Sequence, residues 1–542
     1  MDFKIKGNLV DVFNRKIFPA RVSVGDGKIE SITRIDELLP HYILPGFIDS
    51  HVHIESSMLT PVGFSRLAVR YGTVAVVSDP HEIANVAGSE GVKFMIENSK
   101  KVPLKVFFGA PSCVPATVFE KSGAVLDSQK VGKLLKRDDI YFLAEVMNFP
   151  GVINGDPGVL DKINRAIQYR KPVDGHAPGL TGSDLKKYIN AGISTDHECL
   201  SLAEAEEKIS LGMKIQIREG SAAKGFDLLY ELIDRYPDSV MLCSDDIHPG
   251  DLLKGHINQM LSRGIKLGVN IFNLIKAASI NPVKHYNLPV GMLRTGDHAD
   301  MVIVDNLDDF GIIETYINGE KVYGQGEVLF KGVNQAFHTK FRTTQVGPDD
   351  LKVKATGSRM RVIRAMDGEL YTGSGIIAPR VTGGYVVSDP ESDVLKITVV
   401  NKYENKKPVT AFVSGFGLKK GAIAGSIAHD SHNIIAVGVS DNDIAYAING
   451  IIDLQGGLIA VAYPDTVRLK LEIAGLMTVQ EGTAVAQLQQ ELDDFARQSG
   501  CSLAAPFMSL SFMALLVIPE LKISDQGLFD GINFSFTSLF TD

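Results

Sequence analysis

Two histidines separated by one residue, His51 and His53, end an apolar segment over residues 44–53. Alternate residues of a β-strand point to the same face, so both imidazoles can bind one metal ion from the end of a strand. Such a pair also occurs incidentally on surface strands, and it therefore needs support from elsewhere in the chain. The support comes from side chains that close later strand-like segments: Glu145, His176, His197 and Asp245.

These residue types define the chemistry of the predicted site. Imidazoles and carboxylates without a thiolate suit Zn²⁺, Mn²⁺ or Fe²⁺, and a carboxylate such as Glu145 can bridge two ions. A pair of ions lowers the pKa of bound water and supplies hydroxide at neutral pH. The pattern therefore predicts a two-metal hydrolytic site that attacks an electrophilic carbon. An amide, a lactone or an amidine-like C–NH₂ group would each be a suitable substrate.

Three further carboxylates stand at or just after strand-like segments and are candidates for proton transfer. Asp246 directly follows the last candidate ligand, whereas Glu82 and Glu219 follow other strand-like segments. Each also has a plain structural interpretation, as a solvated loop carboxylate or a helix N-cap. Of the three, Asp246 is the favoured candidate.

The region between residues 46 and 290 alternates short apolar or β-branched segments with amphipathic segments of helical length, for example 158–169, 183–191, 201–211 and 226–236. This alternation is typical of parallel strands joined by crossover helices. Eight such repeats predict an α/β fold, a TIM-like (β/α)₈ barrel with its active site at the C-terminal ends of the strands. A doubly wound open sheet is the alternative, but it would spread the strand ends along an edge. The strand-like segments end near His53, Asp79, Ala110, Val146, His176, Glu198, Glu219 and Asp246.

The flanking regions have a different pattern. Residues 3–34 and 299–330 contain short strand-like segments with turn signals, and we expect them to pack together as one small β-sandwich. From about residue 350 the chain is rich in glycine and β-branched segments, with one helical pattern at 483–498, which predicts an α+β domain. We therefore predict three domains: residues 1–45 with 290–345, a barrel over 46–289, and a C-terminal domain over 350–542.

Composition limits the classes of partner. The chain has 55 Lys+Arg against 64 Asp+Glu, a net charge of -9 and no basic block, which argues against a nucleic-acid polymer. The N-terminal residues lack the apolar stretch of a signal peptide, and the apolar segment 512–519 is too short to span a bilayer. We expect a cytoplasmic protein without a membrane partner. Its four scattered cysteines fit a reducing compartment.

Several motifs resemble those of known enzymes. Residues 45–53, PGFIDSHVH, resemble the signature of the amidohydrolase superfamily, and residues 296–302 resemble the returning strand of its small β domain. The motifs at 54–58, 79–86, 145–152, 175–178 and 244–246, with AHDSHNI at 428–434, are similar to the bacterial adenine deaminase family. The resemblance covers essentially the whole chain.

This resemblance implies hydrolysis of adenine to hypoxanthine and ammonia, in purine salvage or catabolism, at a binuclear Mn²⁺ or Fe²⁺ centre. Many superfamily members bridge their metals with a carboxylated lysine, but no lysine lies in segment 140–146, so Glu145 would take that place. The ligands it implies are His51, His53 and Asp245 for one ion, His176 and His197 for the other, and Glu145 as the bridge.

The same resemblance suggests roles in catalysis. Metal-activated hydroxide would attack C6 of the purine while Asp245 or Asp246 accepts its proton, and Glu82 would protonate the ring or the leaving amine. A homodimer or larger homo-oligomer is also expected. Residues expected to contact the substrate are Glu219, His81, Asn85 and His429.

Three other functions are compatible with parts of this pattern. A cyclic amidohydrolase acting on a hydantoin or dihydropyrimidine would use the same fold and metals. A non-catalytic scaffold would have lost ligands, yet all six are present. A zinc deaminase of the cytidine type is disfavoured because its His-x-Glu and Pro-Cys-x-x-Cys pattern is missing.

Overall fold

The structure, a computed structural model, describes residues 2–542 and divides the chain into two compact units. The first unit contains the N-terminal stretch through His81, Lys93–Ser112 and Asp127–Gln335. The second contains Glu82–Val92, Cys113–Leu126 and Ala336–Asp542. Helix α2 (His81–Ser99) contributes to both units and bends at Gly88, whose φ of 60° is easily adopted only without a side chain.

Eight parallel strands form the centre of the first unit, as the alternating sequence pattern predicts. Strands β5 to β9 pair in sequential order, and β10 to β12 form a second parallel group. A parallel bridge between Val52 and Asp245 joins the end of the last strand to the first. The (β/α)₈ barrel is therefore confirmed. Its strands are β5 (Phe47–Val52), β6 (Thr73–Ser78), β7 (Lys105–Ala110), β8 (Ile140–Val146), β9 (Val173–Gly175), β10 (Thr195–Asp196), β11 (Lys214–Arg218) and β12 (Val240–Cys243).

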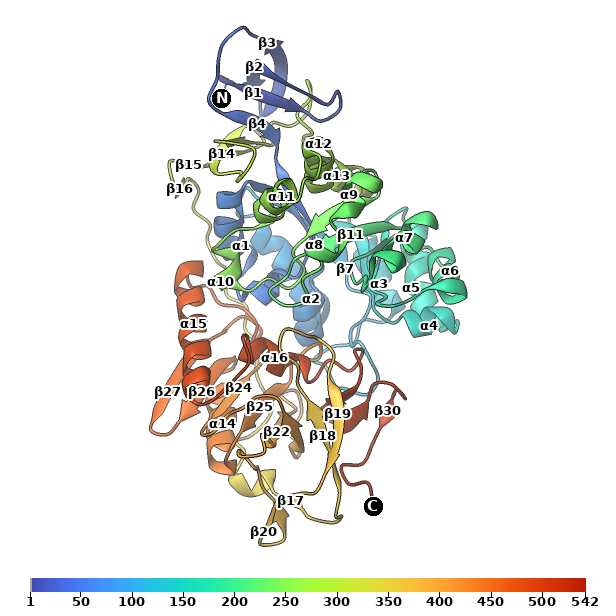
Figure 1. The fold of residues 1–542 in the computed structure, drawn as a ribbon, viewed down its shortest axis with the longest axis vertical. Coiled ribbons are helices and arrows are strands. Elements are labelled where there is room, and N and C mark those ends of the chain that lie inside the picture. The colour runs from blue at the N-terminus through green and yellow to red at the C-terminus, as the bar shows by residue number, and fades with distance from the viewer. Residues whose placement is uncertain (1) are drawn as a thin grey trace. The chain divides into compact units, whose positions relative to one another are not determined.

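Several of the helices between these strands have side-chain N-caps. Asp156 accepts hydrogen bonds from the backbone of α5 (Pro157–Gln168), and Ser201 caps α7 (Leu202–Ser210). The single helix expected at 226–236 is instead two, because the Ile233 N–H bonds to the Tyr230 carbonyl in a tighter turn. The other α-helices of the first unit (Figure 1) are α1 (Pro61–Ala68), α3 (Ser128–Leu135), α4 (Phe149–Ile153), α6 (Gly182–Asn190), α8 (Phe226–Leu229), α9 (Glu231–Arg235), α10 (Pro249–Leu252), α11 (Ile257–Lys266), α12 (Ile271–Ile275) and α13 (Asn281–Tyr286).

The two β segments that flank the barrel in sequence join in one eight-stranded sheet. The join is β4 (Tyr42–Pro45), which pairs in parallel with β1 (Phe3–Asp11) and antiparallel with β13 (Met301–Val304). Figure 1 shows the blue N-terminal strands beside the yellow-green later ones. The expected small β domain is thus one continuous sheet, whose other strands are β2 (Lys16–Gly25), β3 (Lys28–Arg34), β14 (Ile312–Ile317), β15 (Glu320–Gly324) and β16 (Glu327–Val328).

The second unit contains another eight-stranded sheet, which includes β22 (Leu395–Val400), β24 (Ala422–Gly425), β25 (Ile434–Gly438) and β26 (Gly457–Ala462). Helix α15 (Gly482–Gln498) was expected, but α14 (Asp441–Leu454) and α16 (Pro506–Phe512) were not. The expectation of a single helix here is wrong. Helix α14 buries Ile444, Ile448 and Ile451 in the sheet's core.

Two further observations concern the whole described chain. All four cysteines are buried free thiols. Within residues 2–542, the helices are all too short or too polar to cross a membrane.

Candidate metal centre

Six candidate ligands lie at or near the C-terminal ends of five barrel strands. His51 is in β5 and His53 follows it, Glu145 is in β8, and His176, His197 and Asp245 follow β9, β10 and β12. The C-terminal ends of parallel barrel strands meet at one mouth, which is why residues so distant in sequence converge. All six side chains are buried, with 0% to 9% of their residue surface exposed.

The two oxygens of Glu145 face different pairs of histidines. Oε1 lies 3.2 Å from His53 Nε2 and 4.0 Å from His51 Nε2. Oε2 lies 2.8 Å from His176 Nδ1 and 3.3 Å from His197 Nε2. A carboxylate between two pairs of imidazoles has the arrangement that a bridge between two cations requires.

Asp245 lies on the His51 and His53 side of this carboxylate. Its Oδ1 is 3.6 Å from His51 Nε2 and 3.2 Å from His53 Nε2. The backbone of Asp245 is left-handed, with φ of 57°, and its N–H donates to the His51 carbonyl at 2.9 Å. The strained turn therefore directs the carboxylate toward the two histidines of β5.

The ring orientation of His53 is set by a hydrogen bond outside the cluster. Its Nδ1 lies 3.1 Å from the carbonyl oxygen of Asp79, and a carbonyl can only accept. A proton is therefore on Nδ1, which leaves Nε2 as the nitrogen that faces Glu145 and Asp245 and that would bind a metal ion once it has lost its own proton. This is the usual way in which an outer partner prepares a histidine to bind a metal.

Charge complementarity shifts the pKa values in the cluster. Burial would raise the pKa of Glu145, but hydrogen bonds from His176, His197 and His53 hold it well below its usual range. Burial would likewise lower the pKa of His197, but the hydrogen bond and charge of Glu145 raise it to about 9. Protons on the histidines thus provide the positive charge that divalent ions would provide when bound.

The sequence interpretation gave no role to Arg218 or Glu198. Arg218 Nη1 lies 2.8 Å from Asp245 Oδ2, and its guanidinium also pairs with both oxygens of Glu198. Glu198 Oε1 in turn lies 3.6 Å from His176 Nδ1 and from His197 Nε2. The available signal was an arginine at the end of the β11 segment, because a buried guanidinium needs a carboxylate partner.

His81, a predicted substrate contact, and Asp246, a predicted proton-transfer residue, also lie in the first unit. His81 Nδ1 lies 3.0 Å from Asp79 Oδ2 and 3.4 Å from Glu145 Oε1, so it borders the cluster. Asp246 Oδ1 accepts a hydrogen bond from Ser56 Oγ at 2.5 Å. Both side chains are therefore held by neighbours, His81 buried and Asp246 partly buried.

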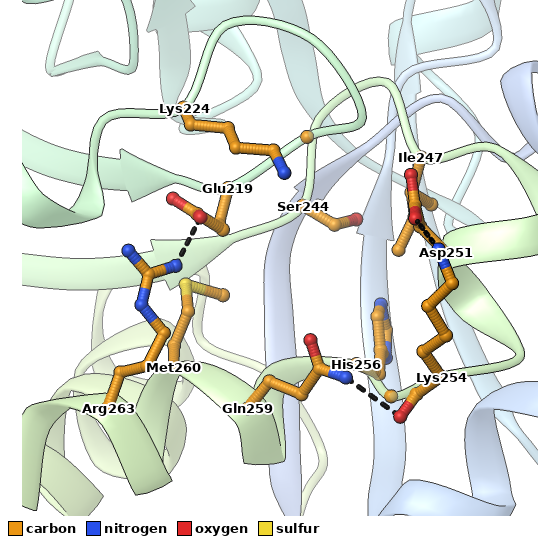
Figure 2. Close-up of a pocket in the computed structure, with 12 residues that line it drawn as sticks. Glu219, Lys224, Ser244, Ile247, Asp251, Lys254, His256, Gln259, Met260 and Arg263 are labelled. Carbon is orange, nitrogen blue, oxygen red and sulfur yellow. Dashed lines mark hydrogen bonds and ion pairs between the residues drawn. The ribbon is translucent and has the colours of Figure 1, made fainter. Parts of the chain in front are cut away.

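Glu219 has a different environment. It is paired with Arg263 and accepts from the Phe226 N–H at 3.2 Å, and it borders a cavity of about 130 Å³. Figure 2 shows its carboxylate directed at the Arg263 guanidinium. This pairing is a structural role, and contact of Glu219 with the substrate stays a prediction.

Glu82, His429 and His432 form a buried cluster within the second unit. Glu82 Oε1 lies 2.9 Å from His429 Nδ1, and Oε2 pairs with His432 Nε2. The Ala428 N–H donates to His432 Nδ1 at 3.4 Å, so Nε2 carries the proton and donates to Glu82. The side chains of Glu82, His429 and His432 lie close enough to hold a metal ion. However, the His432 tautomer directs an N–H group at Glu82, which favours a hydrogen-bonded carboxylate over a metal ligand. Asn85, also in this unit, is buried, and its backbone carbonyl accepts a hydrogen bond from the Gly123 N–H.

The donor set of the first unit fits divalent metal ions. The ligand atoms of His51, His53 and Asp245 lie within 4.8 Å of one another, as do those of His51, Glu145 and His197. Four imidazoles and two carboxylates without thiolate suit a borderline divalent cation of the first transition row.

Comparison with known proteins identifies the family. Residues 42–322 match the amidohydrolase family, and residues 369–535 match the adenine deaminase C-terminal domain. An adenine deaminase of Methanosarcina barkeri is 52% identical over 544 residues and covers 99% of this chain and 99% of the relative. The chain belongs to the adenine deaminase family. Relatives of that name from Salinibacter ruber and Sulfurovum sp. are 51% and 53% identical, covering 100% and 98% of this chain and 99% of each relative.

These matches confirm the family that the sequence motifs indicated. The chain is therefore a hydrolase. Membership of the amidohydrolase family implies a divalent metal centre, and the cluster of imidazoles and carboxylates fits one.

Proposed function

We propose that the chain hydrolyses the exocyclic C6–NH₂ bond of adenine, consuming water and releasing hypoxanthine and ammonia. The observation that carries this proposal is the position of Glu145, whose two oxygens face two separate histidine pairs. Near-full-length identity of about half to proteins named adenine deaminase supports the choice of substrate.

The proposed ligands are His51, His53 and Asp245 for one ion, His176 and His197 for the other, and Glu145 for both. The ions would be Mn²⁺ or Fe²⁺, with Zn²⁺ compatible, since these ligand types accept all three. When bound, the pair would supply activation of water at neutral pH and stabilisation of negative charge.

The chain's own residues would handle the protons. Hydrogen bonds from His51 and His53 and the charge of Arg218 outweigh burial and hold the pKa of Asp245 well below its usual range, which suits a ligand better than a base. We therefore favour Asp246, hydrogen-bonded to Ser56, as the proton acceptor over Asp245. Glu82, in its protonated form, is the proposed donor to the ring or the leaving amine. His81, Asn85, His429 and Glu219 remain proposed substrate contacts.

The remaining proposals rest on the sequence. They are a place in purine salvage, a cytoplasmic location, a homo-oligomeric state and the division at residues 1–45 with 290–345, 46–289 and 350–542.

The test is turnover of adenine by protein reconstituted with Mn²⁺. We expect equal amounts of hypoxanthine, followed by ultraviolet absorbance, and ammonia, with no product from adenosine or a hydantoin. A protein that binds about two metals per chain but leaves adenine unchanged would overturn the substrate and keep the metal site.

A further inference from the structure

Asp49 is a completely buried carboxylate that lies two residues before His51 on β5. Its Oδ1 accepts from the Ser244 N–H at 3.0 Å and from the His51 N–H at 3.3 Å. Its Oδ2 accepts from Ser244 Oγ and lies 2.9 Å from His256 Nε2. Asp49 is neither one of the six candidate ligands nor one of the proposed proton-transfer residues.

His256 is also buried, at 4% exposure, and precedes helix α11. A carboxylate oxygen is a hydrogen-bond acceptor, so the Nε2–H group of His256 is the donor in this contact with Asp49. The other ring nitrogen, Nδ1, lies 2.6 Å from Thr73 Oγ1, at the start of β6. Both nitrogens of the ring are therefore engaged, and its orientation is fixed from both sides.

The residue that Asp49 holds, Ser244, immediately precedes Asp245. The left-handed backbone of Asp245, with φ of 57°, is disfavoured for a residue with a side chain. Anchoring Ser244 through both its N–H and its hydroxyl limits the freedom of the turn in which that conformation occurs.

We propose that His256 is a positioning residue for the metal centre, acting through Asp49 on Ser244 and hence on the Asp245 carboxylate. The hydrogen bonds run from Thr73 through His256 and Asp49 to the turn that carries one ligand and to the backbone of another, His51. The inference rests on the proposed metal centre and adds an outer partner to it. Outer partners of this kind typically change metal affinity or activity by about 10- to 100-fold when they are removed.

The cavity shown in Figure 2 makes the proposal testable by chemical rescue. His256 and Ser244 are among its lining residues, and its volume is about 130 Å³. Truncation of His256 to alanine would enlarge this space by the volume of the ring. Added imidazole could then enter and restore the hydrogen bond to Asp49.

The experiment measures Mn²⁺ affinity by competition with a chromophoric chelator, alongside turnover of adenine. For His256→Ala we expect one of the two ions to bind about 10- to 100-fold more weakly, with recovery on addition of imidazole. His256→Gln keeps an N–H donor near the position of Nε2 and should retain most of the affinity. His285→Ala is the matched control, because His285 lies in the same unit and contacts Ser194 instead of Asp49.

The outcomes separate this inference from the proposed function. If the wild type binds two ions and His256→Ala binds them equally well, or if His285→Ala weakens binding as much, the positioning role is wrong. If the wild type binds no Mn²⁺, the proposed centre itself is wrong and this inference falls with it. Should His256→Ala fail to fold, Thr73→Val removes the support of the ring, and unchanged affinity in that variant overturns the proposal.

Discussion

Arg218 Nη1 lies 2.8 Å from Asp245 Oδ2, and the same buried guanidinium pairs with Glu198. It is therefore the cation shared by two carboxylates that face the histidines of the cluster. Because Arg218→Met would leave both carboxylates buried without their cation, we expect a loss of stability of about 3–5 kcal/mol. The measurement is the urea midpoint of the first unfolding transition. Arg263→Met is the control, since its pairs are more exposed and should contribute under about 1 kcal/mol; equal losses would contradict the prediction.

Glu145→Gln keeps the shape of the side chain but removes the charge between the histidine pairs. We expect the metal content to fall below two per chain and turnover to fall by about 100-fold or more. Elemental analysis and the adenine assay measure the two effects. Glu120→Gln is a matched control, because burial and the nearby Asp430 raise the pKa of Glu120 to about 8, so that it is already neutral at pH 7. Full metal content in Glu145→Gln would contradict its role as a bridge.

Metal loading should release protons. In the metal-free protein the pKa of His197 is about 9, because Glu145 outweighs the opposing effect of burial, whereas a ligating imidazole must give up that proton. Calorimetry at pH 7.5 in two buffers of different ionisation enthalpy should therefore detect at least about one proton released per chain. The apparent affinity should weaken as pH falls below 9 and level off above it. Proton-neutral binding at pH 7.5 would contradict this account.

Lys208 is a buried cation that holds the turns after β9 and β10. Its Nζ donates to the Ala177 carbonyl at 2.8 Å and pairs with Asp196, which accepts from the Ala177 and Glu198 N–H groups. Lys208→Met should cost about 3–5 kcal/mol of stability, because Asp196 would be left as an unpaired buried charge. Thermal unfolding measures the loss. The exposed pair of Lys187 with Asp184 provides the control, and Lys187→Met should shift the midpoint little.

His432 makes the stability of the second unit depend on pH. Burial lowers its pKa to about 4, despite the opposing effect of Glu82. Between pH 6.5 and about 4 the unfolded chain takes up a proton that the folded chain does not, so stability should fall as pH falls, by up to about 3 kcal/mol. In His432→Gln this part of the pH dependence should disappear. Thermal midpoints of both metal-free proteins at pH 7 and pH 5 test it, and parallel shifts would show that His432 is not responsible.

The sequence by itself determined the barrel and the candidate ligands. Strand and helix periodicities are local, so eight strand segments could be identified without a structure, and five of them end near His53, Glu145, His176, His197 and Asp245. Because parallel strands of one barrel end at one mouth, the convergence of these side chains also followed from the pattern. Helix α14 was not predicted, although Ile444, Ile448 and Ile451 repeat at helical spacing and pack against the sheet.

Only the tertiary structure decided which charges meet across the chain. The pairing of Arg218 with Asp245 spans 27 residues, and that of His256 with Asp49 spans 207. Periodicity specifies which face a side chain occupies, but hydrogen-bond partners depend on side-chain rotamers and on register between distant elements. The ligand types were therefore evident from the sequence, whereas the groups that orient them became visible only when folding brought β5, β11, β12 and α11 together.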